Sequence, residues 1–159
     1  MARTTIDELL AAARSGLRRL APAEALAAAR GGAALVDIRG DSQLARDGTV
    51  PGALVIARNV LEWRLDPGSH YRHPQAPGLH DHVIVLCDEG YQSSLAAAIL
   101  QQLGFAAVTD VEGGFQAWRE AGLPVSLPDS PAPAAPRRRC LKRVPACLRA
   151  RTVLRSRTT

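Results

Sequence analysis

The segment CDEGYQSS, Cys87 to Ser94, places a nucleophilic side chain at the start of a polar loop. The apolar run Val83–Leu86 precedes it, and an alanine-rich segment with helical spacing follows it. We therefore expect Cys87 at the carboxyl end of a buried strand, where open α/β sheets bind their ligands. The next helix would begin about six residues later, and its first N–H groups carry partial positive charge.

This loop could surround the sulfur with backbone amides. Gly90 permits the sharp curl that such a bowl requires, and the amides from Asp88 to Ser93 would form an anion-binding nest. A nest of this kind stabilises a thiolate, which is the nucleophilic form of cysteine. The alternative is a buried cysteine that only fills space. The polarity of the loop argues against that alternative.

Short apolar runs alternate with helical segments along the rest of the chain. This alternation is typical of an α/β fold with a mainly parallel sheet, and we predict about five strands with helices on both faces. The first helix begins at the capping box Thr5–Glu8 and continues to Leu17; the next begins at Pro22, a later one is capped by Ser93 or Ser94, and a short one covers 115–121. The clearest predicted strands are residues 33–38, 53–56, 83–86 and 106–111.

Charge divides the chain into two parts. The whole chain has a net charge of +5, but residues 126–159 contain nine Arg or Lys and one acidic residue. Residues 1–125 contain 11 basic and 14 acidic residues, so the body is acidic. We predict an N-terminal helical extension (1–17), an α/β domain (18–125) and a Pro/Arg-rich, disordered tail (126–159). The basic tail could contact nucleic acid or an acidic partner, or be a solvated appendage without a ligand.

Several classes of protein are disfavoured. No apolar stretch of about 18 residues is present, so we expect no membrane span. Acidic and basic residues interrupt the N-terminal segment, so we expect no signal peptide, a cytoplasmic location and reduced thiols. The cysteines form no CxxC pair, and the four histidines within residues 70–82 have no further ligands nearby in sequence. We therefore expect no metal and no organic cofactor.

Four motifs in order resemble those of the rhodanese-like domain, the sulfurtransferase module. They are Leu35–Arg39 (LVDIR), Gly48–Ala53 (GTVPGA), the loop Cys87–Ser93, and GGFQAW from Gly113 through the GLP at 122–124. The resemblance covers roughly residues 18–125. Thr49 stands where histidine is more usual in this family.

The resemblance implies a persulfide cycle. Cys87 would take a sulfane sulfur from a small-molecule or protein persulfide donor and transfer it to a thiol or another nucleophilic acceptor. The catalytic residue would be Cys87. The substrate- and persulfide-binding loop would comprise Asp88, Glu89, Gly90, Tyr91, Gln92 and Ser93.

Two other functions remain open at this stage. One is a non-catalytic interaction or redox-sensing module with the same fold. The other is a cysteine-dependent phosphatase or arsenate reductase. Related phosphatases use a longer loop that ends in arginine, whereas this loop is short and carries Gln92. The acidic Asp88 and Glu89 would repel thiosulfate, so we expect a neutral or protein-borne persulfide donor.

Residues outside the loop have milder interpretations. Asp37 and Arg39 could pair with each other or with the turn at 48–53 and hold the strand ends. Trp63 and Tyr71 could line a rim above Cys87 or simply pack. Phe115 and Trp118 are expected in the core. Cys140 and Cys147 could act as resolving thiols for Cys87.

Overall fold

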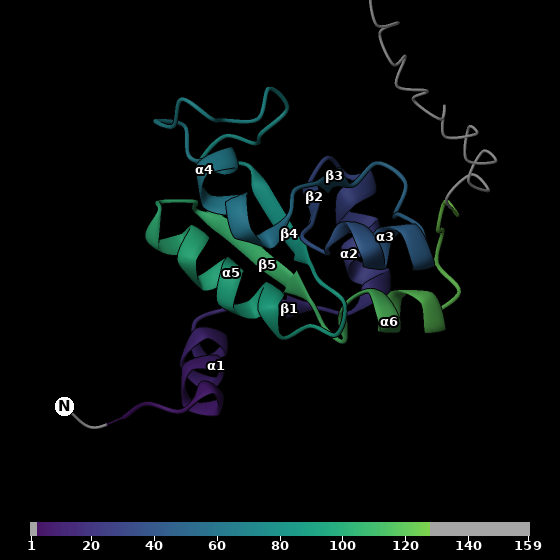
Figure 1. Cartoon of the computed structure of the whole chain (residues 1–159), viewed down its shortest axis with the longest axis horizontal. Coiled ribbons are helices and arrows are strands. Elements are labelled where there is room, and N and C mark those ends of the chain that lie inside the picture. Colours follow the sequence, from purple (N-terminus) through teal and green to yellow (C-terminus); the bar gives the residue numbers. More distant parts are fainter. Residues whose placement is uncertain (1–2, 128–159) are drawn as a thin grey trace, which may run out of the picture. The chain divides into compact units, whose positions relative to one another are not determined.

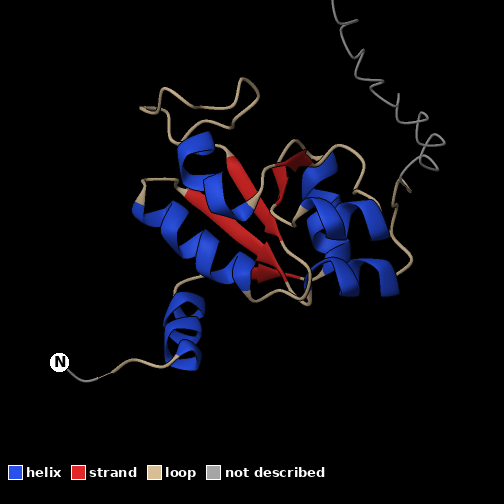
Figure 2. Ribbon diagram, viewed as in Figure 1, coloured by secondary structure: helices blue, strands red, loops and turns tan. Residues whose placement is uncertain are grey.

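The protein contains a five-stranded sheet in which all strands run parallel. The computed structural model describes residues 3–127, and the strand order is β1-β5-β4-β2-β3. Each neighbouring pair is parallel, as Figure 2 shows for the strands at the centre. The strands are β1 (Arg18–Leu20), β2 (Ala34–Asp37), β3 (Leu54–Val55), β4 (His82–Leu86) and β5 (Ala107–Val111).

Helices cover both faces of the sheet, which confirms the predicted architecture. In Figure 1, α5 runs beside β4 and β5, while α2, α3 and α6 lie together on the right of the view. The helices are α1 (Ile6–Ser15), α2 (Pro22–Arg30), α3 (Asp41–Asp47), α4 (Leu61–Leu65), α5 (Gln92–Gln102) and α6 (Gly114–Glu120), with a 3-10 turn at Arg58–Val60.

Alternation along β4 creates two hydrophobic cores. Val83, Val85 and Cys87 point to the face covered by α4 and α5. Ile84 and Leu86 point to the opposite face, where they join Phe115 and Trp118 of α6 and residues of α2. Because both faces of β4 are buried, its sequence is a continuous apolar run.

Some elements differ from the predicted ones. Helix α1 ends at Ser15 instead of Leu17, because the chain turns at Gly16 and Leu17 enters the core beside the sheet. The strand that follows, β1, has only three residues, too few for an alternating pattern to reveal it. Helices α3 and α4 were also not predicted.

The first turn of α5 corrects a further prediction. The helix begins at Gln92 after Tyr91, and no side chain caps it, so neither Ser93 nor Ser94 is the N-cap. Both hydroxyls instead bond within the site described below, where a buried carboxylate accepts them.

The structure describes the predicted helical extension and the α/β domain, but not most of the predicted tail. Helix α1 packs against α5, and both lie in the same compact unit. Residues 128–159, with Cys140 and Cys147, lie outside the described residues, so the predicted tail and its boundary remain predictions. Among the described residues, no helix is long and apolar enough to cross a membrane.

Candidate active site

Cys87 lies directly after β4 and at the start of the loop that leads to α5. Its side chain is buried, with 4% of the residue exposed. The backbone N–H of Gly90 donates to Cys87 Sγ at 3.1 Å. The thiol also lies 3.2 Å from Ser93 Oγ, to which it donates. The loop therefore curls around the sulfur, with the Gly90 amide and the Ser93 hydroxyl as its contacts, and the wider nest of amides from Asp88 to Ser93 stays a prediction.

Helix α6 holds the outside of this loop. Its first N–H groups donate to the loop carbonyls, from Phe115 to Cys87 O at 2.8 Å and from Gln116 to Asp88 O at 3.0 Å. The approach is so close that a Cβ on Gly114 would lie 2.6 Å from both carbonyl oxygens. Carbonyls that face α6 leave the opposite side of the loop to the amide hydrogens. The GG motif is thus a packing requirement of the site.

A buried carboxylate lies behind the sulfur. Asp110, on β5, is fully buried and accepts from Ser93 Oγ at 3.0 Å and from Ser94 Oγ at 2.7 Å. Arg19, on β1, donates to the same carboxylate at 2.9 Å and 3.2 Å. A buried charge requires such partners, because desolvation otherwise disfavours it. A continuous hydrogen-bond path therefore joins Cys87 to Arg19.

Sequence reasoning missed Asp110, Arg19 and a third residue, Arg14. The carbonyl of Gly90 accepts from Arg14 Nη2 at 2.8 Å and from Arg19 Nη2 at 3.1 Å. Arg14 Nε also donates to Ser94 Oγ at 3.1 Å. Arg14 and Arg19 are 71 to 91 positions away from their partners in sequence, and Asp110 is 16 and 17 positions from Ser94 and Ser93, so no local spacing could have indicated them.

A cavity of about 240 Å³ opens beside Cys87. Its lining includes four predicted loop residues, and Gly90 and Ser93 lie buried beneath it. Neither Trp63 nor Tyr71 is part of the lining, and both are exposed elsewhere. The residues that line the cavity are Arg39, Gln43, Cys87, Asp88, Glu89, Tyr91 and Gln92.

Arg39 is the cation in this lining. Asp37 compensates its charge, while its Nη1 is buried without a hydrogen-bond partner among the described residues. Its guanidinium binds Asp37 through Nη2 at 2.6 Å and Nε at 3.0 Å, and Nη2 also donates to Gly48 O at 2.9 Å. The guanidinium stacks 3.6 Å from the Phe115 ring centre. The predicted pairing with Asp37 and with the turn at 48–53 is confirmed. Arg39 therefore ties the end of β2 to the turn at 48–53. The other charged residues that line the cavity are Asp88 and Glu89.

Comparison with known proteins extends these observations. The Rhodanese-like domain family matches residues 21–121. A thiosulfate sulfurtransferase GlpE of Pseudomonas entomophila is 35% identical over 105 residues, which are 66% of this chain and 87% of that protein. A chloroplastic rhodanese-like domain-containing protein of Arabidopsis thaliana is 42% identical over 57 residues, 36% of this chain; the chain spans only 28% of that relative's length.

Among solved structures, a protein of unknown function from Rhodopseudomonas palustris superimposes with a TM-score of 0.71 at 36% identity. The match covers 79% of this chain and 99% of that one, which is named a possible tyrosine phosphatase. The fold and the family match agree. The chain belongs to the Rhodanese-like domain family.

Proposed function

We propose that this protein is a sulfurtransferase that carries a sulfane sulfur as a persulfide on Cys87. The observation that supports this most directly is the geometry of the sulfur. It sits at the end of β4, receives the Gly90 amide at 3.1 Å, and adjoins a cavity of about 240 Å³ that has room for one more sulfur and a small donor. Relatives named sulfurtransferases support the same activity.

The reaction has two displacement steps. The Cys87 thiolate attacks the outer sulfur of a donor R–S–SH, and the donor's S–S bond breaks as R–S⁻ leaves with the bonding electrons. Cys87 then carries the persulfide Cys–S–SH. An acceptor thiolate attacks the outer sulfur in turn, and Cys87 leaves as a thiolate again. Neither step changes the overall redox balance, so no cofactor is required.

Ser93 connects the thiol's protonation state to the buried carboxylate. In the thiol form, Cys87 donates to Ser93 Oγ while the Ser93 hydroxyl donates to Asp110. Once the sulfur has lost its proton, it can accept, and the single Ser93 hydrogen can turn to it. Asp110 keeps Ser94 and Arg19 as partners, so this turn leaves no buried charge unpaired.

Intact mass after exposure to a persulfide donor tests the proposal. We expect one added sulfur atom, removed by cyanide and absent from Cys87→Ser. The double variant Cys140→Ser/Cys147→Ser controls for adducts on the other cysteines and should load as the wild type does. If no donor produced an adduct on Cys87, a non-catalytic interaction module would replace the sulfurtransferase.

The charge of the cavity wall favours an uncharged donor. Asp88 and Glu89 line the cavity, and Arg39 is already paired with Asp37, so a thiosulfate dianion meets net negative charge. We expect slower loading by thiosulfate than by a persulfide whose carbon chain is uncharged. Glu89→Gln should raise the thiosulfate rate at low salt, whereas Glu120→Gln, exposed outside the cavity, should not. Equal rates for both donors in the wild type would contradict this proposal.

The name of the Rhodopseudomonas palustris structure makes phosphatase activity the second candidate. A phosphate ester needs a cation to bind its dianion, but no loop residue from Asp88 to Ser93 is basic. Arg14 and Arg19 donate to the outer carbonyl of the loop, so they are already engaged. We therefore expect no Cys87-dependent hydrolysis of an aryl phosphate, and its detection would favour the phosphatase.

A further inference from the structure

Helix α1 lies outside residues 21–121, the segment that matches the family, yet one of its side chains reaches the active-site loop. We propose that Arg14 of α1 is a positioning residue that holds the cysteine loop in its sulfur-binding conformation and raises the local positive potential at Cys87. The inference deepens the sulfurtransferase proposed above and rests on it.

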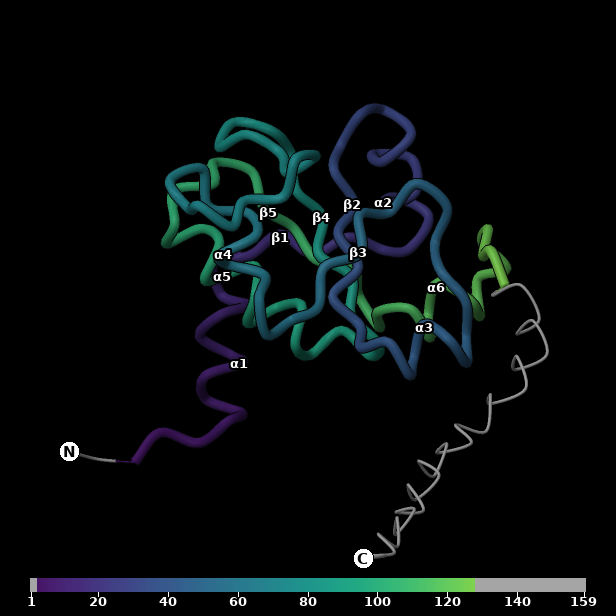
Figure 3. Tube along the Cα trace, turned by 45° about the horizontal axis from the view of Figure 1, so that its top comes forward, coloured from purple at the N-terminus to yellow at the C-terminus, as the bar shows by residue number. Residues whose placement is uncertain are grey.

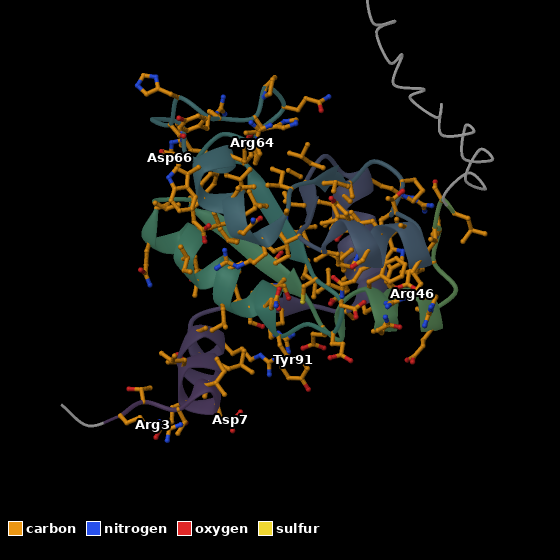
Figure 4. The ribbon with its side chains drawn as sticks, viewed as in Figure 1. Arg3, Asp7, Arg46, Arg64, Asp66 and Tyr91 are labelled. Carbon is orange, nitrogen blue, oxygen red and sulfur yellow. The ribbon has the colours of Figure 1, made fainter. Side chains whose placement is uncertain are left out.

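The contacts of Arg14 are specific to this loop. Its Nη2 donates to Gly90 O at 2.8 Å, and its Nε donates to Ser94 Oγ at 3.1 Å. Its guanidinium also lies 5.6 Å from the centre of the Tyr91 ring, a cavity-wall residue that Figure 4 shows beside α1. One side chain thus contacts three successive parts of the segment 90–94. A planar guanidinium can do this because its donors point in fixed, divergent directions.

Gly90 is the point at which these contacts reach the sulfur. Its N–H donates to Cys87 Sγ, and its carbonyl accepts from two guanidinium groups. The peptide unit that contains this carbonyl is trans, so the N–H of Tyr91 points away from the arginines. The guanidinium groups therefore orient the Gly90–Tyr91 peptide unit, which directly follows the unit whose N–H contacts the sulfur.

The two arginines are not equivalent in charge. Arg19 pairs with the buried Asp110, which compensates its positive charge. Among residues 3–127, Arg14 forms no salt bridge, and its partners are a carbonyl, a hydroxyl and an aromatic ring. Of the two arginines that bind the Gly90 carbonyl, Arg14 is therefore the one whose positive charge is not compensated by a carboxylate among the described residues. A positive charge near a thiol favours the thiolate.

The surroundings allow Arg14 to be changed without disturbing the core. Helix α1 contains no buried residue, and it packs on the surface beside α5, as Figure 3 shows. Its own start is secured by the Thr5–Glu8 capping box, far from Arg14 along the helix. A substitution at Arg14 should therefore act on the loop and not on folding.

The experiment measures alkylation of Cys87 by iodoacetamide as a function of pH, in the full chain with Cys140 and Cys147 replaced by serine. The variants are Arg14→Gln, Arg14→Lys and, as a matched control, Arg18→Gln, which removes the same charge from a nearby exposed position. Thermal unfolding of each variant is measured alongside, and persulfide loading is followed by intact mass.

We expect Arg14→Gln to slow alkylation near neutral pH by a factor on the order of three to ten and to move its pH midpoint upward, since the positive charge beside the loop and its bond to Gly90 O are lost. Arg14→Lys should be intermediate, because it keeps the charge but not the forked contacts. Arg18→Gln should match the wild type. Unfolding would expose the buried thiol and accelerate its alkylation, which is the opposite direction.

An Arg14→Gln profile identical to that of the wild type or of Arg18→Gln would overturn the proposal. Faster alkylation of Arg14→Gln across the pH range would also overturn it, since the helix would then only shield the thiol. Because alkylation needs no sulfur transfer, the shifted midpoint without persulfide loading would support the role of Arg14 and reject the sulfurtransferase.

Discussion

At the scale of single residues, the site depends on Gly90 more than on any charged group of the loop. Its φ of 79° lies in the left-handed region, and a Cβ there would lie 2.8 Å from Gly113 N and 3.1 Å from Val111 O. Two independent constraints, backbone conformation and space, therefore exclude a side chain at the position whose N–H contacts the sulfur.

We predict that Gly90→Ala lowers the free energy of unfolding by roughly 2 to 4 kcal/mol, because strain and contact with fixed backbone add. Persulfide loading should be lost or strongly reduced. The matched control is Gly52→Ala, whose φ is 80° but whose Cβ would meet no atom within 4 Å. It should cost only about 1 kcal/mol of strain and keep loading. Equal destabilisation by the two variants, measured by denaturant unfolding, would contradict this prediction.

At the scale of elements, the pairing of β4 with β5 brings His82 next to Thr109. The His82 Nε2 atom lies 2.9 Å from Thr109 Oγ1. His82 begins β4, which leads to Cys87, and Thr109 lies on β5, which carries Asp110. Burial, and secondarily the charge of Arg18, lower the pKa of His82 below its usual 6.5. The folded state therefore favours the neutral form of this imidazole.

The lowered pKa of His82 predicts a pH dependence of stability. At a pH between the folded pKa and 6.5 the unfolded chain binds more protons at this site, so stability rises with pH. The contribution is complete above pH 6.5 and is lost as the pH falls through the folded pKa. His82→Gln, which can still bond Thr109, should flatten the fall in stability between pH 7 and 5 in urea unfolding. Exposed His80→Gln should leave the wild-type slope; an unchanged slope in His82→Gln would contradict the prediction.

At the scale of the whole molecule, the two cores that the described residues form on either side of the sheet lie within residues 17–125. Every member of both clusters lies in that range. Directly after it, Ser126 forms an isolated antiparallel bridge with Thr49. The acidic body and the strongly basic residues beyond it differ in charge sign, so their electrostatic contributions can be separated experimentally.

We predict that a chain ending at residue 127 unfolds with a free energy within about 0.5 kcal/mol of the full chain, since it keeps every residue of the two described cores. It should load a persulfide at an unchanged rate, which would dismiss Cys140 and Cys147 as resolving thiols. Its retention on a heparin column should fall, because the remaining residues are net acidic. A large loss of stability or of loading would show that the removed residues contribute to the domain.

Several features of this protein could be predicted from its sequence, because they depend on interactions between residues that are close together in the chain. Burial on both faces makes β4 a continuous apolar run, and the sharp curl after it calls for glycine, so the strand, Cys87 and Gly90 were identifiable. The capping box of α1 and the proline at the start of α2 also act within one helical turn. β1 escaped detection because three residues carry no period.

Only the tertiary structure decided what stabilises the loop. Asp110, Arg19 and Arg14 come from β5, β1 and α1, and parallel strands place their carboxyl ends together whatever their distance in sequence. Hydrophobic periodicity indicates which face of an element is buried but not which polar group from another element will meet it. Cys87 was therefore identifiable as a candidate from its neighbours in sequence, whereas the charges around it depended on the packing of distant elements.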